Sequence, residues 1–191
     1  MSFIVKKLTL RDLKKRKRTE DAKALQMLTC YDYQTANLLD ELPLDLILVG
    51  DSLGNVVLGK ETTIEVTLEE MEIFGRAVKR GAPNKFVIID LPFGSYTHFD
   101  KAMDSAVKLL QKTGAEGAYP YQLEIITRLT QNGIPVMGHI GLTPQSVHQM
   151  GGYYTHGKTE SSKESLLREA RELEKAGAFS LVLECVEKSL A

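Results

Sequence analysis

Cysteine is scarce in this sequence, and long hydrophobic runs are absent. Of the 191 residues, two are cysteine and none is tryptophan. Cys30 and Cys185 both stand in apolar segments, which favours a reducing compartment over a disulfide framework. No segment approaches the roughly 18 consecutive apolar residues of a membrane span, and the first residues lack a signal-peptide pattern. The sequence therefore predicts a cytoplasmic protein with no membrane partner.

An excess of charge is also missing. The chain has 24 basic and 25 acidic residues, and its formal net charge is −1. This balance removes the general electrostatic argument for a nucleic-acid partner. We interpret the basic cluster at residues 14–18 as the solvated face of a helix, because acidic residues offset it. The sequence also lacks a phosphate-binding loop, a GxGxxG fingerprint, zinc-type Cys/His spacing and a GxSxG nucleophile elbow, so it gives no support to those sites.

What the sequence does contain is an alternation of apolar, β-branched runs with helical patterns. Such alternation is typical of βα units around a parallel sheet. The predicted strands are Leu25–Tyr31, Leu44–Gly50, Phe86–Leu91, Ile134–Ile140 and Phe179–Val186, and the predicted helices are 32–40, 66–80, 99–113, 122–131 and 162–176. The segment Ala115–Tyr121 is short and rich in Gly and Pro, so we expect the fourth strand to be damaged or missing. No linker divides the chain, and residues 1–191 are predicted to form a single α/β domain.

Polar residues at the carboxyl ends of the predicted strands indicate where the chemistry lies. In parallel α/β folds these ends converge on one mouth. Asp51 follows the second strand and Asp90 ends the third. Two carboxylates on neighbouring strands suit Mg²⁺, which prefers oxygen ligands and leaves positions for a 2-oxo acid whose enolate it stabilises. The alternative is that each aspartate only caps a turn.

Glu184 and His139 are further candidates. Glu184 interrupts an apolar strand, and burial there raises the pKa of a carboxyl toward the range useful to a general base. Alternatively, its side chain reaches solvent at the strand end. His139 either hydrogen-bonds a substrate carbonyl or ties down a loop, and the pattern leaves both interpretations open.

Several motifs occur together and in order. They are Leu28-Thr29-Cys30-Tyr31-Asp32-Tyr33, Leu48-Val49-Gly50-Asp51-Ser52-Leu53-Gly54, Val78-Lys79-Arg80-Gly81-Ala82-Pro83, Asp90-Leu91-Pro92-Phe93, Gly138-His139-Ile140-Gly141-Leu142-Thr143-Pro144-Gln145-Ser146, Gly151-Gly152-Tyr153 and Leu183-Glu184-Cys185-Val186. In these motifs the chain resembles the ketopantoate hydroxymethyltransferase family, within the phosphoenolpyruvate-mutase-like barrel superfamily. The similarity covers nearly the whole sequence.

The resemblance implies a (β/α)₈ TIM barrel that binds Mg²⁺. The implied activity is one-carbon transfer from 5,10-methylenetetrahydrofolate to 3-methyl-2-oxobutanoate, giving 2-dehydropantoate in pantothenate biosynthesis. It implies that Asp51 and Asp90 hold the metal and that Glu184 removes the C3 proton. Asp51, Ser52, Asp90 and His139 are the implied substrate-binding residues, and a cytoplasmic homodecamer is the implied assembly.

The sequence also departs from this family. The family's fourth strand carries a substrate-contacting lysine that has no counterpart here, and Glu116 is the residue that best matches the family's metal-supporting glutamate. A complete barrel typically needs about 250 residues, so we expect an incomplete barrel that lacks the fourth strand and the last two βα units. We expect omitted residues between Ala115 and Glu116 and after Val186. Two other functions remain open, a Mg²⁺-dependent 2-oxo acid lyase or mutase and an inactive scaffold subunit.

Overall fold

The structure is a computed structural model that describes residues 7–15, 24–152 and 154–191. Its strands are β1 (Met27–Thr29), β2 (Leu46–Val49), β3 (Phe86–Asp90), β4 (Gly117–Tyr119), β5 (Met137–Gly141) and β6 (Ser180–Glu184). Its α-helices are α1 (Leu10–Lys15), α2 (Tyr33–Asp40), α3 (Leu53–Val56), α4 (Leu68–Gly81), α5 (Phe99–Thr113), α6 (Leu123–Gln131), α7 (Val147–Met150) and α8 (Glu160–Lys175), with 3-10 turns at Thr63–Glu65 and Pro144–Ser146. Residues 16–18 of the basic cluster and Tyr153 lie outside the described residues, whereas Lys14 and Lys15 are exposed on α1.

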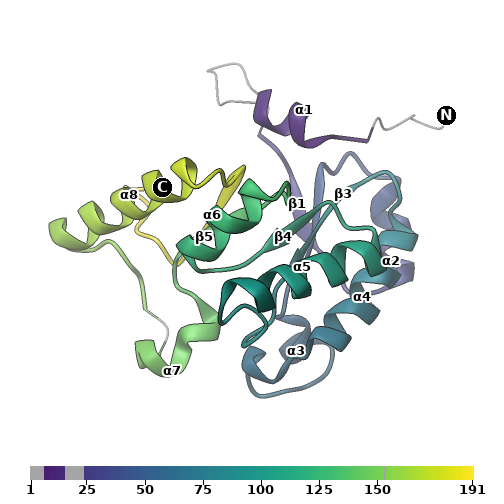
Figure 1. The fold of residues 1–191 in the computed structure, drawn as a ribbon, viewed down its shortest axis with the longest axis horizontal. Helices are drawn as coiled ribbons and strands as arrows, with labels where there is room; N and C mark the ends of the chain where they lie inside the picture. The colour runs from purple at the N-terminus through teal and green to yellow at the C-terminus, as the bar shows by residue number, and fades with distance from the viewer. Residues whose placement is uncertain (1–6, 16–23, 153) are drawn as a thin grey trace.

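The strands are parallel and follow one another in chain order. β1 to β4 form one sheet, and β5 and β6 form a second. A parallel bridge between Ala118 and Val136 joins the two sheets, so the strands continue as one open arc (Figure 1). The predicted α/β class with a parallel sheet is confirmed. Within the described ranges β1 and β6 pair on one side only, and no closed barrel forms.

The expectation that the fourth strand is missing is wrong. β4 pairs with β3 in parallel register, from Ile88 with Gly117 to Asp90 with Tyr119. On its other side, the Ala118 N–H of β4 donates to the Pro135 carbonyl over 2.9 Å. Three residues suffice because every one of them is buried and because Gly117 lets the Pro135 backbone approach closely. The composition of the segment concealed a short strand between two long neighbours.

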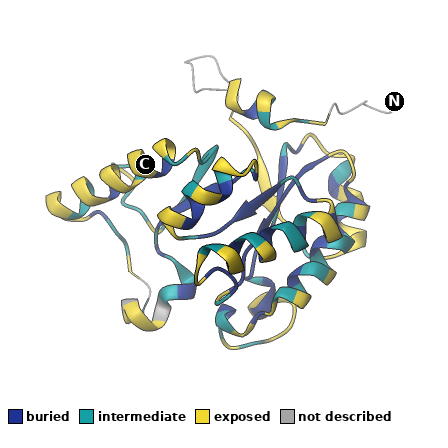
Figure 2. Cartoon of the chain, viewed as in Figure 1, coloured by how far each residue is buried: buried dark blue, intermediate teal, exposed yellow. Residues whose placement is uncertain are grey.

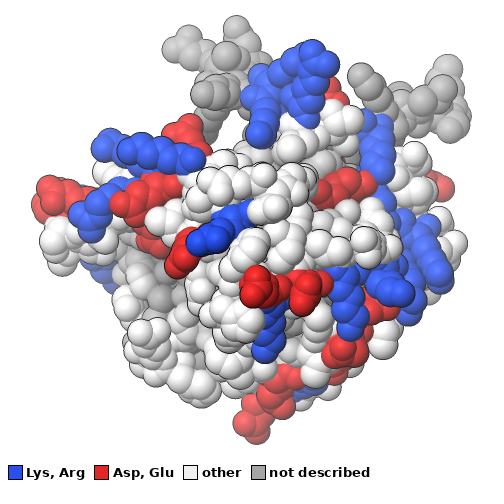
Figure 3. Space-filling view, in the orientation of Figure 1, with Lys and Arg blue, Asp and Glu red and all other residues white. Residues whose placement is uncertain are grey.

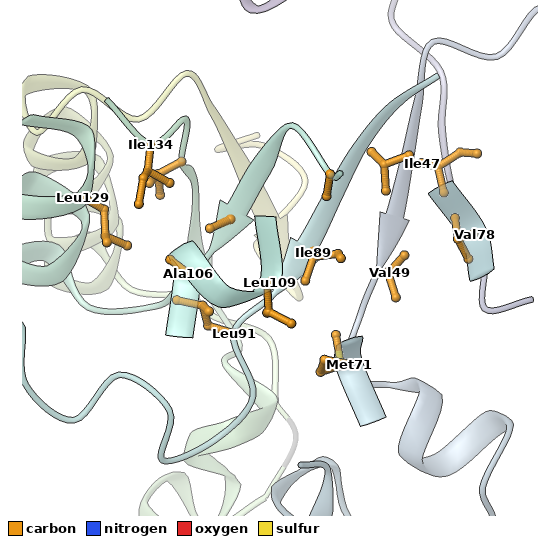
Figure 4. Close-up of a cluster of buried hydrophobic side chains, with 14 of the residues drawn as sticks. Ile47, Val49, Met71, Val78, Ile89, Leu91, Ala106, Leu109, Leu129 and Ile134 are labelled. Atoms are coloured by element: carbon orange, nitrogen blue, oxygen red, sulfur yellow. The ribbon is translucent and has the colours of Figure 1, made fainter. Parts of the chain in front are cut away.

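Side chains alternate between the two faces of the arc, as the two-residue period of a strand requires. One face, with residues such as Ile47, Val49 and Ile89, packs in one cluster with helix residues such as Leu109 and Leu129 (Figure 4). The opposite face, which we call the inner face, carries a smaller apolar cluster made of Leu13, Leu46, Phe86, Ile88, Tyr119 and Met137, with Val182 packed against it. Leu13 comes from α1, which lies at the amino end of the strands, while α3 and α7 lie at the opposite end (Figure 1).

Local signals in the sequence explain the helix boundaries. Thr67 caps α4 by accepting from the Glu70 N–H, and the Glu70 side chain returns to the Thr67 N–H in a capping box. α5 ends at Gly114, whose φ of 78° is the left-handed conformation that favours glycine. Both boundaries match the sequence prediction.

The outer surface is mixed in character. The helices expose their outer faces and β2 to β5 are mostly buried (Figure 2). The two edge strands are less covered, since Leu28 of β1 is 51% exposed and β6 is half-buried. On the face seen in Figure 3, acidic and basic side chains are interspersed and neither sign covers the face. Among the described helices, none is both long enough and apolar enough to cross a bilayer. Cys30 is buried, Cys185 is exposed, and both are free thiols, as the sequence predicts.

Candidate active site

The predicted acidic residues meet at the carboxyl end of the strands. Asp90 is the last residue of β3, and Asp51 follows β2 by two residues. Both aspartates are buried, with 3% of Asp51 and 2% of Asp90 exposed. The Asp51 N–H donates to Asp90 Oδ2 over 3.0 Å, so the turn after β2 is fastened to the end of β3. We call Asp51 and Asp90 the aspartate pair.

The aspartate pair is held in an environment that disfavours two negative charges. Burial, and then the charge of Asp51, raise the pKa of Asp90 well above its usual range. Burial also raises the pKa of Asp51, although a hydrogen bond from Gln145 Nε2 to Asp51 Oδ2 opposes the shift. Asp90 Oδ1 is buried and has no hydrogen-bond partner. Within the described ranges, no lysine or arginine pairs with either carboxylate.

Glu184 and His139 lie on the same face of the arc. Glu184 ends β6, two residues beyond Val182, and His139 lies in β5, two residues beyond Met137. Val182 and Met137 both contribute to the apolar cluster on the inner face, so the two-residue period places Glu184 and His139 there too. Glu184 Oε2 lies 3.4 Å from His139 Nε2. Burial, and then the charge of Asp51, raise the pKa of Glu184.

Ser52 completes the set of residues brought together. It precedes α3, next to Asp51, and its Oγ lies 2.7 Å from the hydroxyl of Tyr31. Gly50 leaves room for the Ser52 hydroxyl, since a Cβ at position 50 would lie only 3.1 Å from Ser52 Oγ. The turn after β2 therefore presents a hydroxyl beside the aspartate pair.

Glu116, which the sequence match predicts to support the metal, is not brought to this site. It precedes β4 and so lies at the amino end of the sheet, opposite the aspartate pair. Its Oε1 pairs with Lys79 Nζ at 2.7 Å and with Lys7 Nζ at 2.6 Å, and its Oε2 accepts from the Val87 N–H. The sequence match depended on the following glycine, which here begins a strand.

Sequence reasoning missed several residues of the site. Gln145 bonds Asp51 and the Leu91 carbonyl, and it accepts from the hydroxyl of Tyr96. The ring of Tyr119 stacks on His139, and the ring of Tyr121 lies against it at an angle of 37°. The tyrosines belong to loops or to the unrecognised β4, so no periodicity marked them. The available sequence signal was the place of Gln145 in a Thr-Pro-Gln run after a predicted strand.

The residues present fit a divalent cation at the aspartate pair. Mg²⁺ needs oxygen ligands and is usually held by one or two protein carboxylates with water and substrate. The pair supplies two carboxylates, an unpartnered Asp90 Oδ1 and a local excess of negative charge that a cation would offset. The described residues contain no cluster of three or more acidic, histidine or cysteine ligands, so the donor set is a two-carboxylate one.

An open cavity of about 340 Å³ is lined by Gln145, which donates to Asp51. Tyr96, which donates to Gln145, also lines the cavity, and further lining comes from Phe93, Tyr121 and Gln122. Its mixture of aromatic and amide side chains, and its size, are typical of small-molecule sites. The site can therefore hold a cation and still admit organic substrates.

Known proteins are similar to this chain along most of its length. The family model described as ketopantoate hydroxymethyltransferase matches residues 7–191. The 3-methyl-2-oxobutanoate hydroxymethyltransferase of Thermotoga maritima is 50% identical over 186 residues, covering 94% of this chain and 68% of the relative. The enzyme of the same name from Heliobacterium modesticaldum is 47% identical over 193 residues, covering 98% of this chain and 69% of the relative.

Solved structures share the fold at low sequence identity. A phosphonopyruvate hydrolase matches with a TM-score of 0.66 and 12% identity, over 94% of this chain and 63% of that one. A 2,3-dimethylmalate lyase, a member of the PEP mutase/isocitrate lyase superfamily, matches with a TM-score of 0.61 and 15% identity, over 87% of this chain and 59% of that one. The chain thus spans about three fifths of these structures, and the likeness supports the fold.

Proposed function

Since the chain belongs to the ketopantoate hydroxymethyltransferase family, we propose that it transfers a one-carbon unit from 5,10-methylenetetrahydrofolate to 3-methyl-2-oxobutanoate. The observation that carries the proposal is the aspartate pair, with its unpartnered Asp90 Oδ1, at the same edge of the arc as Glu184. Together these residues offer a cation site and a base, as deprotonation beside a keto group requires.

The aspartate pair would hold Mg²⁺. When bound, the cation polarises the keto oxygen of the 2-oxo acid and stabilises the enolate. Ser52, beside Asp51, would donate its hydroxyl to the substrate carboxylate. Asp90 and His139 form the buried floor on which the substrate would rest.

Glu184 would act as the base. Its carboxylate takes the proton from C3 of 3-methyl-2-oxobutanoate, and its raised pKa brings it closer to the pH at which it must accept and release that proton. The C3 carbon then bonds to the methylene carbon of the folate as one of the two bonds from that carbon to nitrogen breaks. Water displaces the second nitrogen and supplies the hydroxyl oxygen, the two nitrogens take up protons from Glu184 and from the water, and 2-dehydropantoate and tetrahydrofolate leave.

The cavity beside Gln145 would receive the folate. Phe93 and Tyr121 offer aromatic surface for a flat ring, and Gln122 and Gln145 offer amides for its polar edge. Gln145 lines the cavity and donates to Asp51, so a folate bound there would lie one side chain away from the aspartate pair. A role in pantothenate biosynthesis, a location in the cytoplasm and assembly as a homodecamer follow from the family resemblance.

The transfer itself is tested with a folate labelled at the methylene carbon. Incubation with 3-methyl-2-oxobutanoate and Mg²⁺ is expected to yield labelled 2-dehydropantoate, detected by mass spectrometry. Cleavage or rearrangement of a 2-oxo acid without folate would instead support the lyase or mutase alternative. Binding of substrates with no turnover would support the inactive scaffold.

A further inference from the structure

Tyr119 is a buried residue of the site to which the proposed function gives no role. It ends β4, directly opposite Asp90 in the parallel register. Only 3% of Tyr119 and 2% of His139 is exposed. Their rings stack with centroids 5.4 Å apart and an interplanar angle of 5°, and the Tyr119 hydroxyl is hydrogen-bonded to His139 Nδ1. The tyrosine therefore holds one edge of the imidazole.

The other edge of the imidazole faces the proposed base. His139 Nε2 lies 3.4 Å from Glu184 Oε2. This nitrogen is buried and forms no hydrogen bond in the present geometry. Tyr119, His139 and Glu184 thus form a line across β4, β5 and β6, ending at the carboxylate.

The protonation states of the first two residues follow from their burial. Burial raises the pKa of the Tyr119 hydroxyl, so this group keeps its proton. Burial lowers the pKa of His139 to about 4, although the Leu142 backbone opposes the shift, so the imidazole is neutral at pH 7. A neutral imidazole has one N–H and one acceptor nitrogen.

Electrostatics selects between the two tautomers. If Nδ1 carried the proton, the lone pair of Nε2 would face the Glu184 carboxylate and repel it. If Nδ1 accepts from the Tyr119 hydroxyl, the N–H lies on Nε2 and points at Glu184. The second arrangement keeps the bond from Tyr119 and turns a donor toward the carboxylate, because a histidine tautomer is set by the hydrogen bond at its other nitrogen.

We propose that Tyr119 is a positioning residue that acts through His139, fixing the Nε2–H tautomer so that the imidazole holds one oxygen of Glu184. The other oxygen, Oε1, is then directed toward the C3 proton of the substrate. The inference rests on the proposed function for the role of Glu184. β4 consists of Gly117, Ala118 and Tyr119, so it presents this tyrosine and no lysine.

The test compares Tyr119→Phe with the full chain. The variant keeps the stacked ring and removes only the hydroxyl. Tyr154→Phe is the matched control, because Tyr154 also stacks on a histidine, His156, but is 51% exposed. NMR of ¹⁵N-histidine-labelled protein without substrate reports the tautomer of His139, assigned among the four histidines by substitution.

The expected result is an Nε2–H tautomer for His139 in the unmodified chain at pH 7, and its partial loss in Tyr119→Phe. Removing a residue that orients a functional group typically costs about 10–100-fold. We accordingly expect kcat for C3 proton exchange to fall roughly tenfold, with KM for the 2-oxo acid within about twofold. Tyr154→Phe should match the unmodified chain in both measurements.

Two results would overturn the inference. One is an Nδ1–H or doubly protonated His139 in the unmodified chain, a measurement that needs no variant to fold. The other is a folded Tyr119→Phe protein that exchanges the C3 proton as fast as Tyr154→Phe. Absence of exchange in the unmodified chain would instead reject the proposed function and leave the tautomer result standing.

Discussion

Glu116 shows how much the role of a single residue depends on its position in the fold. Its match to a metal-supporting glutamate rested on the glycine that follows it in the sequence. In the structure its carboxylate pairs with Lys79 and accepts from the Val87 N–H. Both members of the Lys79–Glu116 pair are largely shielded, with 11% and 19% of their side chains exposed. In this position the glutamate stabilises the sheet.

Substituting Glu116→Ala tests this assignment. The change leaves the Lys79 charge and a backbone donor without their acceptor, and we expect a loss of about 1–3 kcal/mol in the free energy of unfolding. Mg²⁺ affinity, measured by calorimetry, should stay within about twofold. Glu69→Ala serves as the control, since its ion pair with Lys108 is exposed and such pairs contribute about 1 kcal/mol or less. A large loss of Mg²⁺ affinity with unchanged stability would restore Glu116 to the metal site.

Asp90 gives a pH-dependent prediction for the metal-free chain. Its pKa is raised in the fold, above the value of about 3.9 expected when unfolded. Below that unfolded pKa the carboxyl is neutral in both states, and as pH rises through the folded pKa the buried charge lowers stability. Asp90→Asn removes this buried charge, so it should stabilise the chain by about 1–2 kcal/mol at pH 7 in the presence of a chelator. Stabilising substitutions typically gain an amount of this size.

Urea unfolding at pH 7 and at pH 4 measures that gain, which should shrink at the lower pH. The exposed Asp104 supplies the control, as Asp104→Asn should leave stability within about 0.5 kcal/mol at both values. A destabilised Asp90→Asn at pH 7 would mean that the carboxylate is not under electrostatic strain.

At the scale of elements, prediction worked where the signal was local. Five strands and the caps at Thr67 and Gly114 follow from apolar runs and from backbone chemistry contained in a few residues. The prediction missed β4 because this strand is stabilised by its neighbours on both sides and its own composition is not typical of a strand. The sites of Asp51, Asp90 and Glu184 at one edge were predictable from strand order, whereas the contacts of Gln145 and Tyr119 depend on tertiary packing.

Gly141 is the element-scale feature that shapes the site. It ends β5 with a φ of +90°, and a Cβ there would lie 2.2 Å from the backbone oxygen of Glu184. Gly141→Ala must therefore separate β5 from β6 just where the proposed base is held. We expect the steric clash to lower the free energy of unfolding by about 1–3 kcal/mol, in addition to the cost of backbone strain, and to slow turnover at least roughly tenfold.

Gly133→Ala is the matched control for this change. Gly133 also has a positive φ, +83°, but a Cβ added there would have no neighbouring atom within 4 Å. Its free energy of unfolding should fall only by the cost of the backbone strain, about 1–2 kcal/mol, and turnover should be preserved. Equal losses in chemical denaturation and equal activity for the two variants would contradict the importance of the close approach.

At the scale of the whole molecule, the parallel arc explains why chemistry gathers at one edge. Successive parallel strands bring Asp51, Asp90, His139 and Glu184 to one end, and α1 lies at the other. This arrangement is the consequence of βα alternation, which the sequence showed clearly. The central claim is therefore that this edge converts a 2-oxo acid into its enolate.

Deuterium exchange at C3 of 3-methyl-2-oxobutanoate, followed by proton NMR in D₂O without folate, tests that claim most directly. The account predicts exchange that requires Mg²⁺, stops on addition of a chelator, is lost by at least about 100-fold in Glu184→Gln and persists in the control Glu187→Gln. Exchange that continues at the original rate in Glu184→Gln, or that ignores the metal, would contradict it.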